Sequence, residues 1–216
     1  MTTLTLYALF FVILLFSIIT HEVAHAYAAS FRGDHTARAL GRTTFNPFVH
    51  ADLFGTIILP ALLLIMQSGI LFGWAKPVPI NTSNFSNPRL DMAIVSASGP
   101  LSHFVLAALA GVVLHVFMAT PLAQDPATLQ TVGVVCAIAI RVNVILGILN
   151  LVPIPPLDGS KILYAVLPAD LAIQYSRLER YGFIIVLVLV MSGILFRVLG
   201  PLIQTLINLF SGGLVR

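Results

Sequence analysis

The residues best suited to chemistry are His21, Glu22 and His25, which lie at the end of a long apolar segment. On a helix, positions i and i+4 lie about 40° apart on one face, so both imidazoles can bind one zinc ion. Glu22 would lie beside that metal, where a carboxylate can accept a proton from zinc-bound water. A shuffled chain of this composition would contain the pattern about 0.0015 times, so the spacing indicates a catalytic zinc centre. The alternative is a helix end whose three polar side chains extend to water.

Catalytic zinc usually has three protein ligands, and Asp158 is the candidate for the third. It follows Pro153, Pro155 and Pro156, which end the preceding helix and leave backbone polar groups free at membrane depth. Irregular backbone at that depth is tolerated at a cavity and not against lipid, so an acid after the break can turn inward to a metal. An exposed acid in a loop is the other interpretation.

These two segments resemble the paired signatures of the site-2 proteases, a family of intramembrane zinc metalloproteases. Residues 21–25 match its HExxH motif, and residues 150–159 match its NxxPxPxLDG motif. Residues 73–81, the pair Gly99-Pro100 and the loop with Asn46-Pro47, His50 and Asp52 also look like the small branch of the family, which lacks PDZ and CBS domains. The resemblance covers roughly residues 5–165.

The resemblance implies that His21, His25 and Asp158 bind Zn²⁺ and that Glu22 is the general base. It further implies that Asn150 helps to hold the substrate or the transition state. The expected substrate is a partly unwound transmembrane segment of another protein, cleaved from a site on the cytoplasmic side.

Further polar residues of the apolar segments are candidates for substrate binding. His103 stands where the family pattern GPxxN usually has asparagine, so it could hydrogen-bond substrate, bind metal, or only pack between helices. Asn143 lies seven residues before Asn150, so both project from one helix face, toward the site or into an interhelical hydrogen bond.

Other polar residues are expected to be structural. Arg141 lies about 160° around the helix from Asn143 and is expected to extend to water or to pair with an acid. His50 and Asp52 could line the entrance, although helix capping is the favoured interpretation. His35 and His115 have no assigned role.

Composition favours a membrane protein. Only 9% of the 216 residues are charged, whereas a soluble domain has about 25%. Hydrophobic residues make up 58% and the mean hydropathy is +1.01, more apolar surface than a soluble fold could hide. The net charge of +3 comes from scattered basic residues, which disfavours nucleic-acid binding. The single cysteine, Cys136, excludes a disulfide framework.

We therefore expect an all-α polytopic membrane protein with about five transmembrane helices, at residues 4–29, 53–73, 92–119, 129–151 and 180–199. A C-terminal apolar segment at 201–214, after a break at Gly200-Pro201, is expected to lie along the membrane or re-enter it. Between the first and third helices, residues 43–45 suit a short strand, and Pro77 and Pro79 favour an extended segment. Residues 1–216 form one expected domain, with a catalytic core at about 5–165 and C-terminal helices at 180–214.

The residues at the two ends of the first helix indicate whether it is retained and how it crosses the membrane. The N-terminal apolar run resembles a signal peptide but begins without a basic residue, so we expect it to remain uncleaved. Arg32, Arg38 and Arg42 favour a cytoplasmic 30–51 loop, whereas Lys76 and Arg89 follow the next span, so segment 74–90 is expected to dip back. The expected location is the plasma membrane of a prokaryote.

The favoured function is an intramembrane zinc endopeptidase acting in regulated proteolysis. One alternative is a metal-ion or proton transporter that uses the same His, Glu and Asp cluster as a transit site. A haem-binding electron carrier, which would need histidine pairs across helices, is a weaker alternative.

Overall fold

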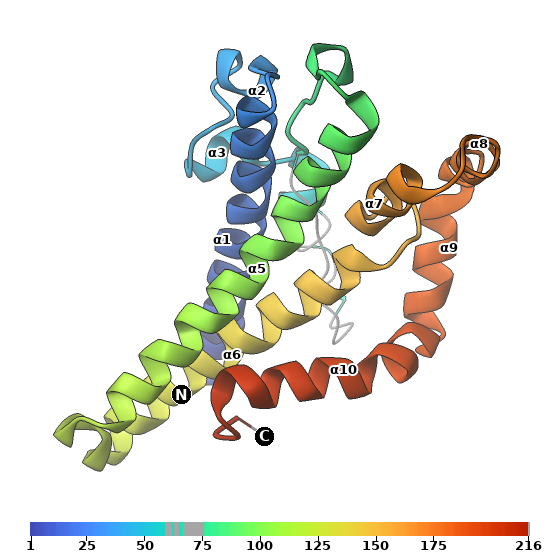
Figure 1. Cartoon of the computed structure of the whole chain (residues 1–216). Helices are drawn as coiled ribbons and strands as arrows, with labels where there is room; N and C mark the ends of the chain where they lie inside the picture. Colours follow the sequence, from blue (N-terminus) through green and yellow to red (C-terminus); the bar gives the residue numbers. More distant parts are fainter. Residues whose placement is uncertain (59–61, 63–64, 67–75, 216) are drawn as a thin grey trace.

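The computed structural model describes residues 1–58, 62, 65–66 and 76–215, and this part of the chain is built from helices (Figure 1). The longer helices are α1 (Thr3–Phe31), α5 (Pro88–Met118), α6 (Pro126–Leu151), α9 (Glu179–Met191) and α10 (Ile194–Ser211). The shorter ones are α2 (Thr36–Ala39), α3 (Pro47–His50), α7 (Asp158–Val166) and α8 (Ala169–Ser176), with single turns or short helices at Leu53–Ile58, Thr82–Asn84 and Pro121–Gln124.

Within the described residues, the four helices α1, α5, α6 and α10 are long and apolar enough to cross a membrane. The first three confirm the predicted spans at 4–29, 92–119 and 129–151. Local sequence explains where two of them begin. Asn87 accepts a hydrogen bond from the N–H of Leu90 at the start of α5, and Asp125 accepts one from Thr128 at the start of α6. A proline follows each cap, at a position where the missing N–H costs nothing.

Helices α5 and α6 form an antiparallel pair, and α1 packs beside α5 (Figure 1). Helix α10 crosses this pair near the end distant from α7. The contact is close, because a methyl group at Gly111 of α5 would overlap the carbonyl of Phe210. The apolar core lies between these three helices and contains Ala107, Leu114, Cys136, Ile140, Val144, Ile148, Ile203 and Ile207.

The C-terminal prediction was partly wrong. The span expected at 180–199 is divided between α9 and α10, because Gly193 adopts a left-handed φ of 70° that ends α9. Gly200 and Pro201 lie inside α10 instead of breaking it, and the expected tail at 201–214 mostly belongs to that helix. Helix α9 has 13 residues, fewer than the roughly 20 that a transmembrane helix needs.

Three expectations between α1 and α5 have different outcomes. The span at 53–73 lies largely outside the described residues. The strand at 43–45 is absent, as is any other strand in the part of the chain that the structure describes. The carbonyl of Thr44, which a strand ladder would use, instead accepts a hydrogen bond from the side chain of His50. Residues 76–81 form neither helix nor strand, as their prolines predict.

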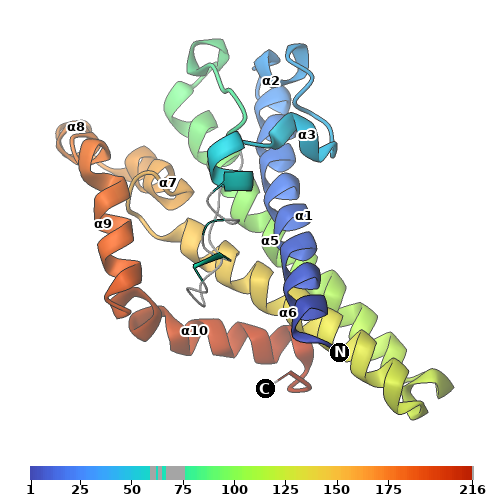
Figure 2. The same cartoon turned by 180° about the vertical axis from the view of Figure 1, so that it is seen from behind.

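The C-terminal end of α1 contacts several of the surrounding elements. Helices α2 and α3 lie beside it (Figure 2). Arg32, just past the end of α1, forms an ion pair with the fully buried Asp91 at the start of α5. Asp91 also accepts a hydrogen bond from the N–H of Asn87 at 2.9 Å. The ends of α1 and α5 are thereby joined close to the residues that were predicted to do chemistry.

Candidate metal centre

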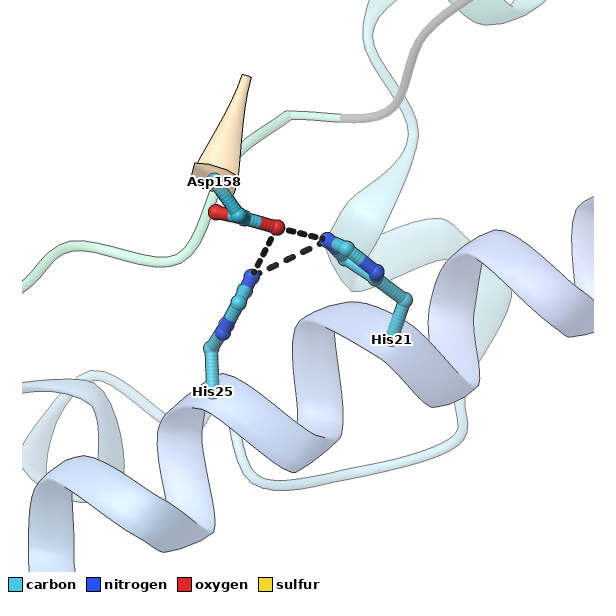
Figure 3. A group of neighbouring side chains, drawn as sticks. All are labelled: His21, His25 and Asp158. Atoms are coloured by element: carbon cyan, nitrogen blue, oxygen red, sulfur yellow. Dashed lines mark hydrogen bonds and ion pairs between the residues drawn. The ribbon is translucent and has the colours of Figure 1, made fainter. Parts of the chain in front are cut away.

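His21 and His25 lie one turn apart on α1 and face Asp158, the first residue of α7 (Figure 3). The Nε2 atoms of the two histidines are 2.9 Å apart, and Asp158 Oδ2 lies 3.2 Å from His21 Nε2 and 3.3 Å from His25 Nε2. Two ligand atoms about 2.0–2.1 Å from a tetrahedral zinc ion would be about 3.3 Å apart. All three side chains are buried. The donor set and its spacing therefore fit a single zinc ion.

The hydrogen bonds around the three side chains also fit a metal. His25 Nδ1 lies 2.8 Å from the carbonyl oxygen of Val95, so Nδ1 carries the proton and Nε2 presents its lone pair to the centre. Asp158 Oδ2 and His21 Nδ1 are buried without a hydrogen-bond partner. A buried, unsatisfied carboxylate oxygen that faces two imidazole nitrogens is a costly arrangement unless a cation lies between them.

Two glycines give the centre its shape. A methyl group at Gly99 of α5 would overlap the rings of both His21 and His25, so the α5 backbone can approach the histidines only where a side chain is missing. A methyl group at Gly159 would overlap the carbonyls of Leu151 and Val152. The absence of a side chain there lets the proline-rich segment fold back tightly and bring Asp158 toward α1.

Glu22 lies between the two histidines in sequence and is partly buried. Its Oε2 accepts a hydrogen bond of 2.7 Å from the backbone N–H of Val78, in the segment 76–81, which is neither helix nor strand. The carboxylate next to the candidate ligands in sequence is therefore held by a donor 56 positions later in the chain. A carboxylate in this position can accept a proton from a water molecule at the centre.

The three residues proposed to bind substrate occupy different environments. His103 is fully buried, with its ring centroid 5.0 Å from that of His21. Its Nδ1 lies 3.0 Å from Asn143 Oδ1, which is the interhelical hydrogen bond that was the alternative interpretation of Asn143. No nitrogen of His103 belongs to the group of potential metal ligands found among the described residues. The amide nitrogen of Asn150 donates to the carbonyl of Leu146 on its own helix at 3.0 Å.

The remaining polar residues have structural contacts. Asp52 accepts hydrogen bonds from the N–H groups of Phe54 and Gly55, as expected of a cap. His50 is buried and donates to the carbonyl of Thr44 at 2.8 Å. His115 donates to the carbonyl of Gly111 on its own helix. Neither histidine, nor the exposed Arg141, belongs to the ligand group.

Asp34 is a structurally important residue that the sequence did not single out. Its fully buried carboxylate accepts hydrogen bonds from the hydroxyl of Thr36 at 2.5 Å, the amide of Asn84 at 2.7 Å and the N–H of Asn81 at 2.7 Å. Burial alone would raise the pKa of Asp34, but these hydrogen bonds outweigh it and hold the pKa below its ordinary value. The Gly-Asp turn followed by Thr36 is the one local signal for this site.

Lys161 is a second contact that the sequence did not single out. Its Nζ lies 3.7 Å from Asp158 Oδ1, the carboxylate oxygen that does not face the histidines. The two residues are three positions apart on α7, where side chains are neighbours. The partly exposed ammonium group therefore offsets the negative charge of Asp158 on the side that points away from the histidines.

The chain is similar in sequence to a known peptidase family and to named bacterial proteins. A profile of "Peptidase family M50" matches residues 118–193. The chain is 38% identical to "Putative zinc metalloprotease YwhC" of Bacillus subtilis over 202 residues, which cover 92% of this chain and 89% of that protein. It is 30% identical to "Putative zinc metalloprotease Rip2" of Mycolicibacterium smegmatis over 85% of this chain and 66% of that protein. No solved structure matches the chain.

Proposed function

Because the chain belongs to peptidase family M50, the family of the site-2 proteases, we propose that it is an intramembrane zinc endopeptidase that hydrolyses a peptide bond within or near a transmembrane segment of another membrane protein. The observation that carries the proposal is the convergence of His21, His25 and Asp158 on one point, next to Glu22. The zinc metalloprotease names of the relatives make Zn²⁺ the metal.

Each residue of the centre has a role that follows from its chemistry. His21, His25 and Asp158 would hold the ion, and the bound ion would supply a polarised peptide carbonyl and a more acidic water. Glu22 would take the proton of the attacking water and pass it to the leaving amine. The Val95 carbonyl would keep His25 in the tautomer that exposes Nε2.

The substrate has to present an extended backbone, because a transmembrane helix hides its peptide bonds within its own hydrogen bonds. Segment 76–81 lies next to Glu22, and its two prolines favour an extended conformation, which suits it to receive such a stretch as an added strand. His103, Asn143 and Asn150 are proposed to contact the substrate or to support the groups that do.

The location follows from the composition and the relatives. With several helices apolar enough to cross a bilayer and relatives in bacteria, the protein is an integral membrane protein. We place it in the bacterial plasma membrane, with the substrate cleaved from the cytoplasmic side. A transporter that uses the same cluster is not favoured, because the relatives are named as metalloproteases.

The proposal is tested by measuring zinc content and proteolysis together. Wild type, Glu22→Gln and Glu179→Gln are purified in detergent and incubated with a panel of single-span membrane proteins. Glu179 is the other glutamate of the chain and is exposed on α9, so it is the matched control. We expect zinc in all three proteins, cleavage by wild type and by Glu179→Gln, inhibition by a chelator, and no cleavage by Glu22→Gln. Cleavage by Glu22→Gln would overturn the assignment of the base.

A further inference from the structure

We propose that the backbone N–H of Val78 positions Glu22 for proton transfer, which makes Val78 a positioning residue of the active centre. This inference rests on the proposed function, since it assumes that Glu22 is the general base. It adds a group from outside the two sequence motifs and gives segment 76–81 a task besides receiving substrate.

The contact itself is short. Val78 N–H donates to Glu22 Oε2 at 2.7 Å, at the short end of the range for N–H···O hydrogen bonds. A glutamate side chain has three rotatable bonds, and α1 alone does not select one of its rotamers. A donor that binds one oxygen restricts those rotamers and fixes the direction of the other oxygen. Proton transfer requires such a fixed geometry.

The segment that carries this donor is anchored on both sides of Val78. The N–H of Lys76 donates to the carbonyl of His50 at 2.8 Å, and the N–H of Asn81 donates to the buried carboxylate of Asp34 at 2.7 Å. The side chain of Val78 is 7% exposed and packs with Ala26, one helical turn beyond Glu22 on α1. The N–H therefore meets Glu22 as part of a fixed structure.

The sequence around Val78 leaves no substitute for this donor. Pro77 and Pro79 have no backbone N–H, so Val78 provides the only amide donor among residues 77–79. Both prolines also favour the extended conformation that directs this amide toward α1. Because this N–H is used by Glu22, it is not available to pair with a substrate strand. The proposal therefore predicts that the loss of this N–H impairs the chemical step and leaves substrate binding intact.

Two variants separate the hydrogen bond from the side chain. Val78→Pro removes the N–H, whereas Val78→Ala shortens the side chain and keeps the N–H. Zinc per chain, kcat and KM are measured for both with a substrate that wild type cleaves. We expect Val78→Pro to lower kcat about 10- to 100-fold, a range typical of lost supporting contacts at metal centres. KM and zinc content should stay within about twofold of wild type, and Val78→Ala should keep most of its kcat.

Three outcomes would overturn the proposal. One is a wild-type kcat in Val78→Pro, and another is a raised KM with unchanged kcat, which would make the N–H a substrate contact. The third is an equal loss of kcat in Val78→Ala, which would make packing the cause. If Val78→Pro does not fold, replacement of the amide at position 78 by an ester removes the N–H and keeps the valine side chain, and the same expectations apply. Activity in Glu22→Gln would instead disprove the proposed base, whatever Val78 does.

Discussion

The backbone of Gly99 in α5 packs directly against the imidazole of His21 in α1, with no room for a Cβ atom between them. The same position faces the ring of His25. The packing of α1 on α5 therefore determines where both histidine rings lie. The helix that contributes no ligand to the candidate centre still sets its geometry.

Gly99→Ala is expected to disturb the centre directly. The added methyl group must displace one or both histidine rings, and overpacking of this kind costs about 1–3 kcal/mol. We expect zinc content and proteolysis to fall together and the thermal unfolding temperature to drop. Gly133→Ala in α6 is the matched control, because apart from the adjoining residues and backbone of its own helix nothing described lies within 4 Å of the added Cβ. Wild-type zinc content in Gly99→Ala would show that the rings can move without loss of the metal.

Asp158→Asn is expected to remove most of the bound zinc. The side chain keeps its size but loses the negative charge that balances the ion, and its oxygen is a weaker ligand. Zinc per chain, measured after dialysis against a mild chelator, should fall well below that of wild type. Asp170→Asn, at an exposed position on α8, should retain wild-type zinc content. Full zinc occupancy in Asp158→Asn would mean that another residue completes the ligand set.

Part of this centre could be predicted from local sequence. His21 and His25 are four residues apart, so they share one face of any helix that contains them. Asp158 lies more than 130 positions from the histidines, and its place in the ligand set was expected from the resemblance to the site-2 proteases. The contacts of Gly99 and Val78 could not be predicted in this way. They join α1 to segments more than 50 positions away, and no local pattern specifies which backbone groups meet across that distance.

The C-terminal helices show the same limit. Gly193 and Gly200 are both plausible helix ends, and the proline after Gly200 favoured a break there. Gly193 ends α9 because it adopts the left-handed conformation, while Pro201 remains inside α10. A proline inside a membrane helix is tolerated when neighbouring groups satisfy the freed carbonyl. The local sequence therefore did not distinguish between two helix-end signals of similar strength.

Asp34→Asn is expected to destabilise the protein in a pH-dependent way. The lowered pKa of Asp34 means that its charged form stabilises the fold. This contribution is fully present above the unfolded-state pKa of about 3.9 and is lost as the pH falls through the lower folded-state value. A hydrogen-bonded charged group contributes about 1.5–3 kcal/mol. Thermal unfolding should therefore show a large difference between wild type and Asp34→Asn at pH 7, and a smaller one at a pH below about 3.5.

The control for Asp34 is Asp170→Asn, whose exposed side chain should change the unfolding temperature little at either pH. Equal stability of wild type and Asp34→Asn at pH 7 would contradict the role of Asp34. Because Asp34 anchors Asn81, we also expect Asp34→Asn to loosen segment 76–81.

His103→Asn tests whether the buried histidine acts on the metal or supports its surroundings. The substitution restores the residue that the GPxxN pattern usually has, but the shorter side chain withdraws from the ring of His21 and changes the contact with Asn143. Since His103 is outside the ligand group, we expect unchanged zinc content. We also expect a lower kcat/KM, because His21 loses a neighbouring ring. Asn143 loses a buried hydrogen-bond partner, which should lower the free energy of unfolding by about 1–3 kcal/mol. Asn143→Ala should lower the unfolding temperature similarly, since it removes the other half of the pair. Loss of zinc in His103→Asn, with zinc retained in Asn143→Ala, would make His103 a fourth protein ligand and would refute the supporting role.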